Sequence, residues 1–284
     1  MTLLIFGKSG QVATELQRRM PDALFLDRTT VDLSDSDACA AAVRQHAPSA
    51  VINAAAYTAV DRAEEDEAQA MVINGDAPGE IAKACAAEHI PLVHISTDYV
   101  FDGTGERPWR PDDPVNPQNV YGRSKLAGEE AVRRAGGVHA ILRTSWVFSA
   151  HGNNFVKTML RLSETRDALD IVADQIGGPT PADALAEACI VVASALKEAP
   201  EKSGTYHFSG QPPTSWECFA RETFARAGRA VLVTGIATSS YPTAALRPLN
   251  SRLDTSSLTK AFGIHAPDWR AGLDRVLAEL DNAG

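Results

Sequence analysis

The chain opens on Leu3-Leu-Ile-Phe-Gly-Lys-Ser-Gly-Gln-Val-Ala13, an apolar run that meets glycine and then becomes helical in pattern. Four apolar residues ended by glycine are typical of a strand buried on both faces of a sheet. Gly7 would permit a tight turn, and Gly10 would let the backbone approach a pyrophosphate at a helix N-terminus. Ala13 is small enough for helix and strand to pack closely. The stretch predicts a dinucleotide-binding turn, and a plain strand-helix turn is the alternative.

Strand-like and helical stretches alternate through roughly the first 165 residues. Such alternation favours parallel strands joined by right-handed crossovers. We therefore expect a doubly wound parallel α/β sheet, with Leu169–Val172 as a further strand of it. The expected strands are 3–6, 23–26, 50–53, 91–95 and 138–142, and the expected helices include 14–20, 35–43 and 68–87.

The last third of the chain has a different rhythm, with long loops that often carry substrate contacts. We expect two domains: a dinucleotide-binding domain at 1–172 and a smaller α/β substrate-binding domain at 173–284, interleaved at their boundary. The expected elements of the second are helices at 182–197, 216–227 and 269–280, and short strands at 204–208 and 230–233.

Composition excludes several classes of protein. The 284 residues carry a formal net charge of −9 and no run of lysine and arginine, which disfavours nucleic acid and anionic membrane as partners. The apolar N-terminal run is too short for a signal peptide or a membrane span. The four cysteines are far apart among apolar residues, so we expect small buried side chains in a cytoplasmic protein: Cys39, Cys85, Cys189 and Cys218.

A second stretch carries candidate chemistry. Asn119-Val-Tyr-Gly-Arg-Ser-Lys-Leu-Ala-Gly-Glu-Glu130 is rich in helix formers, and we expect a helix from near Asn119 to Gly136-Gly137. Tyr121 and Lys125 are four residues apart and would share one face. An ammonium favours the phenolate, so the pair suits proton exchange with a substrate oxygen. A tyrosine packed on a lysine stem is the alternative.

Thr97 lies in Ser96-Thr-Asp-Tyr-Val-Phe-Asp-Gly103, directly after the fourth expected strand. The carboxyl edge of a doubly wound sheet is where ligands bind. A hydroxyl there could hold the substrate oxygen while Tyr121 exchanges the proton.

Other residues could line the dinucleotide. Asp27 follows the second strand, where a carboxylate would accept hydrogen bonds from ribose hydroxyls and repel a 2′-phosphate. Arg28 could attract that phosphate, so both NADH and NADPH remain open. Asp32 and Leu33 could touch the adenine, with a solvated capping aspartate as the alternative. Asn53-Ala-Ala-Ala56 ends the third strand in small residues that would admit a cofactor.

With Thr97, Tyr121 and Lys125 beside a glycine-rich turn, the chain resembles the extended short-chain dehydrogenase/reductase superfamily. Within it, the chain is similar to the dTDP-4-dehydrorhamnose reductases. The motifs that carry the resemblance begin at Gly7 and end at Asp254, and they are residues 7–12, 53–61, 96–103, 121–129, 143–148, 152–155 and 247–254.

The resemblance implies a Rossmann-like fold and an activity. NADPH or NADH would deliver hydride to C4 of dTDP-4-dehydro-L-rhamnose and give dTDP-L-rhamnose, the last step of dTDP-rhamnose synthesis for surface polysaccharide. Tyr121 would donate a proton to the alkoxide, Thr97 would hold the C4 oxygen, and Lys125 would lower the pKa of Tyr121 and hold the nicotinamide ribose. Positions matching cofactor contacts are Gln11, Val12, Ala54, Ala55, Ala56, Tyr57 and Thr58. Positions matching or suiting contacts to the dTDP-sugar are Asp98, Trp146, Asn153, Asn154, Arg247, Asn250 and Arg252.

Two departures and two alternatives accompany the resemblance. Ala13 replaces the family's third glycine. Some of these reductases form a magnesium-bridged homodimer; Glu15 and Glu279 match its ligands, and Asp183 stands where a longer glutamate would be. These carboxylates could equally be surface charges, and we assign no metal site. The alternatives are another nucleotide-sugar reductase or epimerase, and a dinucleotide-holding regulatory subunit without turnover, against which the intact Thr97, Tyr121 and Lys125 argue.

Overall fold

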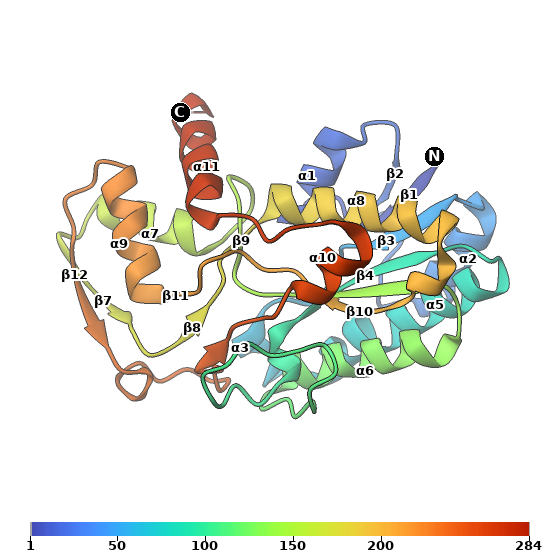
Figure 1. Ribbon diagram of the computed structural model, residues 1–284, viewed down its shortest axis with the longest axis horizontal. Coiled ribbons are helices and arrows are strands. Elements are labelled where there is room, and N and C mark those ends of the chain that lie inside the picture. The colour runs from blue at the N-terminus through green and yellow to red at the C-terminus, as the bar shows by residue number, and fades with distance from the viewer. Residues whose placement is uncertain (1, 284) are drawn as a thin grey trace.

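A computed structural model describes residues 2–283 and shows two lobes (Figure 1). In the larger lobe a parallel sheet lies between two layers of helices, and the smaller lobe adjoins one end of it. The sheet has six strands in the order β10-β5-β4-β3-β1-β2. Its strands are β1 (Leu3–Phe6), β2 (Leu24–Leu26), β3 (Ala50–Asn53), β4 (Leu92–Thr97), β5 (His139–Thr144) and β10 (Gly204–His207).

Every neighbouring pair in this sheet is parallel, as the alternation of elements predicted. The chain runs outward from β1 to β2 and then crosses to β3 on the other side of β1. That reversal of direction is the topological switch point at which doubly wound sheets bind ligands. The doubly wound α/β fold is confirmed.

Helices cover both faces of the sheet. On one face lie α2 (Ser36–His46), α5 (Ala77–Ala87) and α6 (Val120–Ala135), which enclose an apolar cluster around Val51 and Ile141. On the other face lie α1 (Gln11–Arg19) and α8 (Ala182–Glu198), which pack on each other. Shorter helical segments precede α5 and follow β4: α3 (Val60–Ala63), α4 (Glu67–Met71), the π-helix η1 (Val72–Asp76) and the 3-10 helix η2 (Asp98–Val100).

The smaller lobe is built from short strand pairs and an aromatic core that includes Phe148, Phe219 and Trp269. Its strands are β6 (Val147–Phe148), β7 (Ala168–Val172), β8 (Ile176–Gly177), β9 (Thr180–Pro181), β11 (Thr214–Ser215), β12 (Leu232–Ile236) and β13 (Asn250–Ser251). Its helices are α7 (Phe155–Ser163), α9 (Trp216–Arg226) and α11 (Trp269–Ala283), while α10 (Ser256–Phe262) packs near β10. Short 3-10 turns are η3 (Pro200–Lys202) and η4 (Thr238–Ser240).

Two expectations from the sequence are wrong, those for Leu169–Val172 and for Cys218. Leu169–Val172 is not a strand of the large sheet, because β7 pairs with β12 in a separate ribbon. Conversely, β10 pairs with β5 and α8 covers the large sheet, so the chain re-enters that lobe well after residue 172. Cys218 is exposed rather than buried, unlike the other three cysteines.

Local signals fix α6, the helix that carries Tyr121. The Asn119 side chain accepts a hydrogen bond from the Gly122 N–H, which caps the first turn. Gly136, at φ +71°, ends the helix in the left-handed conformation that glycine adopts without strain. Gly122 also lets the helix approach η2, since a Cβ there would lie 2.3 Å from the Tyr99 carbonyl oxygen. The expected helix bounds are confirmed.

None of the helices within residues 2–283 combines the length and the apolar character needed to cross a bilayer.

Candidate active site

The candidate site lies at the carboxyl ends of the central strands. Gly7 follows β1, Asn53 ends β3, and Thr97 and Thr144 are paired at the ends of β4 and β5. Side chains that follow parallel strands share one edge of the sheet. The structure thus brings the glycine turn, the alanine run at 54–56 and Thr97 to one edge.

Thr97 and Tyr121 face each other from β4 and α6. The Thr97 hydroxyl donates to the Asp98 carboxylate (3.1 Å) and accepts from the Tyr99 N–H (3.2 Å). Burial raises the pKa of Tyr121 to about 12, although its hydrogen bond with the Thr97 hydroxyl works in the opposite direction. The Tyr121 ring meets the Tyr99 ring edge-on, with 5.4 Å between ring centroids. Tyr121 therefore holds its proton at neutral pH and stands beside a second hydroxyl.

Lys125 lies one turn further along α6 and is buried. Its Nζ donates to the Ile95 carbonyl (2.7 Å) and lies 3.5 Å from Nε2 of His94. Burial lowers the pKa of Lys125 to about 8, and the charge of Glu129 opposes that shift. Lys125 is not among the groups that shift the pKa of Tyr121 here, because its nitrogen is turned toward the Ile95 carbonyl, and its effect on that pKa stays a prediction.

Unpaired polar atoms mark the space next to Thr97. Within residues 2–283, the buried side-chain atoms without a hydrogen-bond partner include Asp98 Oδ2, Thr144 Oγ1 and Ser251 Oγ. Thr144 is the strand neighbour of Thr97, and the Ser251 hydroxyl faces the Asp98 carboxylate. Buried polar atoms normally find partners. Asp98 and Ser251 face each other and can pair, whereas the Thr144 hydroxyl has no partner and lies beside Thr97, which indicates a site for a polar ligand.

Because the Asp98 carboxyl is buried, we expect it to make the free energy of unfolding depend on pH. Burial raises its pKa from 3.8 to about 6. A raised carboxyl pKa means that the folded state binds the proton more tightly than the unfolded state. Stability from this group is therefore full below pH ~4 and declines between pH ~4 and ~6, by on the order of 2–3 kcal/mol.

We expect Asp98→Asn to remove that decline. The free energy of unfolding, measured with urea at pH 4 and at pH 7.5, should favour the variant over the unaltered protein much more at pH 7.5. An equal difference at both pH values would contradict the raised carboxyl pKa. The comparison of two proteins at each pH cancels the titration of all other groups.

The glycine turn forms a cradle that suits a dinucleotide. Gly7 has φ +107°, and a Cβ there would lie 3.3 Å from the Ala55 nitrogen. A Cβ on Gly10 would meet nothing within 4 Å, so open space lies before the N-terminus of α1. Ala13 is buried and packs in the place that a third glycine would take. Close backbone approach beside an open helix N-terminus fits a bound pyrophosphate.

Other predicted cofactor residues are placed as follows. The Gln11 side chain bridges to the small lobe, donating to the Val147 carbonyl (3.2 Å) and accepting from Ser149 (2.9 Å). Val12 and Leu33 are buried in the cores on the two faces of the sheet. Thr58 is exposed, and the Asp32 carboxylate caps its own turn at the Ser34 N–H. Tyr57 is held by Asp66 and by the buried Asn74.

The acidic residue after β2 has local partners. Asp27 Oδ1 accepts hydrogen bonds from the hydroxyls and backbone N–H groups of Thr29 and Thr30, and Lys8 lies 3.5 Å from Oδ2. The threonine bonds hold the pKa of Asp27 well below its usual range. Arg28 is exposed beside it. At the expected adenosine ribose position, Lys8 therefore lies beside the Asp27 carboxylate, and the exposed Arg28 follows it in sequence.

Trp146 is held by aromatic and glycine neighbours. Its backbone has φ +51°, a conformation that is strained for a bulky residue. Its indole stacks on Trp216 with 3.6 Å between ring centroids, and a Cβ on Gly177 would lie 2.7 Å from that ring. Trp216 in turn donates to Gln175 (3.1 Å). Strain of this kind persists where neighbours enforce it, often at ligand sites.

Of the five polar residues predicted to bind the dTDP group, four are bonded within the chain and one, Asn153, is exposed. Asn154 caps α7, and Asn250 is buried with its amide bonded to the Thr104 and Arg107 carbonyls, so both side chains are engaged within the chain. Asn153 is exposed. Arg247 pairs with Asp61, and Arg252 donates to Asn250 (3.0 Å).

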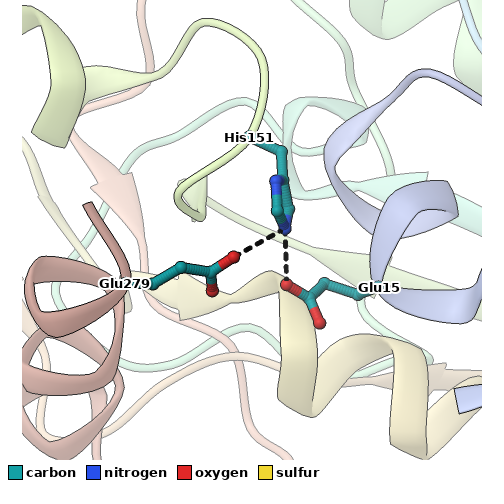
Figure 2. Close-up of side chains that lie close together, drawn as sticks. All are labelled: Glu15, His151 and Glu279. Atoms are coloured by element: carbon teal, nitrogen blue, oxygen red, sulfur yellow. Dashed lines mark hydrogen bonds and ion pairs between the residues drawn. The ribbon is translucent and has the colours of Figure 1, made fainter. Parts of the chain in front are cut away.

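Figure 2 shows Glu15 of α1, His151 and Glu279 of α11 pointing toward one another. The His151 Nε2 lies 3.0 Å from Glu15 and 3.5 Å from Glu279. Arg18 donates to both Glu279 oxygens, and Arg19 donates to Glu15 (2.8 Å). Asp183 pairs with Arg275 instead of joining the cluster. Two guanidinium groups already neutralise the carboxylates, and imidazole is not a preferred Mg²⁺ ligand, so these residues do not fit magnesium.

Sequence reasoning missed four residues of the site. His94 lies in none of the motifs, while Thr144 and Ser251 lie in motifs 143–148 and 247–254 without having been assigned a role. The fold brings these three residues to Lys125, Thr97 and Asp98. Trp216 opens α9, far from Trp146 in sequence. The one sequence signal for Trp216 was a tryptophan at the expected start of a helix, and it did not indicate contact with Trp146.

Comparisons with known proteins agree on the family. A family model described as "RmlD substrate binding domain" matches residues 1–282. The dTDP-4-dehydrorhamnose reductase of Sinorhizobium fredii is 42% identical over 289 residues, covering 99% of this chain and 98% of that protein. A crystal structure of a dTDP-4-dehydrorhamnose reductase from Clostridium acetobutylicum matches with TM-score 0.92 and 36% identity, over 99% of this chain and 100% of that one. A dTDP-4-dehydrorhamnose reductase from Bacillus anthracis in complex with NADP matches with TM-score 0.90 and 35% identity, over 98% and 100%.

Proposed function

Because the chain belongs to the RmlD substrate binding domain family, we propose that it reduces the C4 ketone of dTDP-4-dehydro-L-rhamnose to dTDP-L-rhamnose with NADPH or NADH. One observation carries the proposal: the Thr97 and Tyr121 hydroxyls meet at the carboxyl end of β4, beside the Gly7 cradle. Two hydroxyls there can hold and protonate one carbonyl oxygen next to a dinucleotide.

The reaction needs a hydride, an acid and a hold on the oxygen. A bound reduced nicotinamide supplies the hydride. Tyr121, whose phenol is protonated at neutral pH, gives its proton to the C4 oxygen as negative charge develops there. The Thr97 hydroxyl donates a second hydrogen bond to that oxygen. Lys125 holds the cofactor ribose from its place one turn along α6.

The second lobe supplies the sugar nucleotide site in this proposal. The Trp146 indole lies against the sugar, seated by Trp216 and Gly177. Arg247 and Arg252 remain the candidates for the diphosphate, because a planar guanidinium matches phosphate oxygens. Asn154 and Asn250 receive less support, since their amides are bonded within the chain.

Arg28, which follows Asp27 in sequence, leads to a prediction about cofactor choice. We expect Arg28→Ala to lower kcat/KM for NADPH about tenfold, the effect of losing one exposed contact to a 2′-phosphate. The value for NADH, which lacks that phosphate, should change little. Steady-state kinetics with both cofactors measures this, with Arg44→Ala, an exposed arginine of α2, as the matched control. Equal losses of kcat/KM with both cofactors would show that Arg28 does not bind the 2′-phosphate.

Other properties follow from the family as proposals. We place the reaction in the cytoplasm and propose that the protein can form a homodimer. The guanidinium-filled cluster around Glu15 leads us to propose turnover without magnesium.

The deciding experiment supplies purified protein with dTDP-4-dehydro-L-rhamnose and follows the absorbance of NADPH or NADH, with and without EDTA. We expect cofactor oxidation in both conditions and dTDP-L-rhamnose as the product. UDP-glucose serves as the control substrate and tests epimerase activity. If folded protein oxidises neither cofactor, the proposed function is wrong.

A further inference from the structure

A buried histidine lies against Lys125. Alternate residues of β4 face α6, so His94 and Ser96 point to the same helix. On that helix Lys125 and Glu129 are one turn apart. Ser96 donates to Glu129 (2.7 Å), and His94 Nε2 lies 3.5 Å from the Lys125 Nζ. Two strand residues therefore meet two helix residues in register.

Asn53 determines which ring nitrogen carries hydrogen. It is the strand partner of His94, and both side chains are buried. The Ala55 N–H donates to Asn53 Oδ1 (3.2 Å), which turns the amide NH₂ toward His94 Nδ1 at 3.3 Å. A nitrogen that accepts from an amide carries no hydrogen of its own. The hydrogen of the neutral ring then sits on Nε2, facing Lys125.

The surroundings keep this ring neutral. Burial holds the pKa of His94 well below its ordinary value, and the charges of Lys125 on α6 and His139 on β5 act in the same direction. Glu129, further along α6, is engaged by Arg143 and Ser96. The groups facing Lys125 are thus the Ile95 carbonyl, an imidazole N–H and, one turn away, the Glu129 carboxylate.

We propose that His94 is a positioning residue for Lys125, with Asn53 selecting the tautomer that directs Nε2–H at the lysine nitrogen. The proposal deepens the proposed function and rests on it. An N–H aimed at the nitrogen favours the amine over the ammonium, whereas a lone pair would favour the ammonium. The Asn53–His94 pair therefore sets where the nitrogen lies and at which pH it gives up its proton.

The tautomer is tested first and without turnover. The protein labelled with ¹⁵N-histidine is measured by NMR at pH 7, and His94→Gln identifies the His94 signals among those of the seven histidines. We expect a neutral ring with hydrogen on Nε2 and none on Nδ1. Hydrogen on Nδ1, or a charged ring, would overturn the proposal even if the protein reduces the dTDP-sugar.

The second test is the pH profile of kcat/KM for NADPH, whose alkaline limb reports the loss of a required proton. Asn53→Asp places an acceptor at Nδ1, which moves the hydrogen there and turns the Nε2 lone pair toward Lys125. We expect the alkaline limb to move up by about one pH unit or more. His94→Leu should also change the limb and raise KM for NADPH. His94→Gln should preserve both, because its amide can accept from Asn53 and donate to Lys125.

His265→Gln is the matched control, since it removes an exposed histidine outside the large sheet, and its profile should match the unaltered protein. Thermal unfolding of each variant separates loss of fold from loss of positioning. An unmoved limb in Asn53→Asp with intact fold would overturn the proposal. Failure of the unaltered protein to reduce the dTDP-sugar would instead refute the proposed function. The His94 proposal would then be decided by the tautomer measurement.

Discussion

Tyr121→Phe is expected to lower kcat about a thousandfold, because it removes the phenol that faces Thr97, and general acid catalysis contributes about 10²–10⁴-fold. The phenyl ring keeps the edge-on contact with Tyr99 and the packing near Val120, so the fold and the cofactor site should be preserved. Binding of NADPH, measured by fluorescence titration, should change by less than about threefold.

Tyr206→Phe is the control for loss of a phenol elsewhere in the same sheet. Tyr206 lies on β10, and its hydroxyl donates to the Lys202 carbonyl at the end of η3, away from the site. We expect this variant to turn over at the unaltered rate. A Tyr121→Phe variant that retains more than about a tenth of kcat would exclude the proton-donor role, since the loss would then fall below the general-acid range.

The predictions from sequence succeeded where the signals were local. Asn119 and Gly136 mark the ends of α6 by side-chain capping and by a left-handed turn, and both are visible within a few residues. Gly7 and Gly10 likewise lie where strand meets helix, as predicted. In these segments the neighbouring residues alone determine the backbone.

The predictions failed where residues far along the chain determine the sheet to which a strand belongs or the direction of a side chain. The apolar pattern of Leu169–Val172 indicates a strand and not its sheet, and the observed partner, Leu232–Ile236, lies far along the chain. The same holds for Gly204–His207, which pairs with β5. The direction of Lys125 depends on His94, a residue that no motif singled out. Asn250 lies in a motif of the family, yet its amide donates to the Arg107 carbonyl within the chain. The motif alone did not indicate this structural bond.

Arg143→Met should cause the largest loss of stability. Arg143 and Glu129 are both buried, and the guanidinium donates from Nε (2.8 Å) and Nη2 (2.6 Å) to the two carboxylate oxygens. The bonds from Arg143 and Ser96 hold the pKa of Glu129 below its usual value against the effect of burial. Removing Arg143 leaves the buried Glu129 carboxylate with only the half-exposed Arg133 (3.2 Å) as a cation. Breaking a buried pair typically costs about 3–5 kcal/mol, and urea unfolding at pH 7 should show a loss toward the lower end of that range.

Two variants separate the pair from its surroundings. Arg134→Met removes an exposed pair with Glu130 on the same helix and should leave the unfolding curve unchanged. Adding Glu129→Leu to Arg143→Met removes the stranded carboxylate and should recover part of the loss, because an apolar pair can replace a buried ion pair at little net cost. A loss of unfolding free energy below about 1 kcal/mol in Arg143→Met would show that this pair contributes no more than a surface ion pair does. A large loss with recovery would show that the helix carrying Tyr121 and Lys125 is anchored to β5 through the Glu129–Arg143 pair.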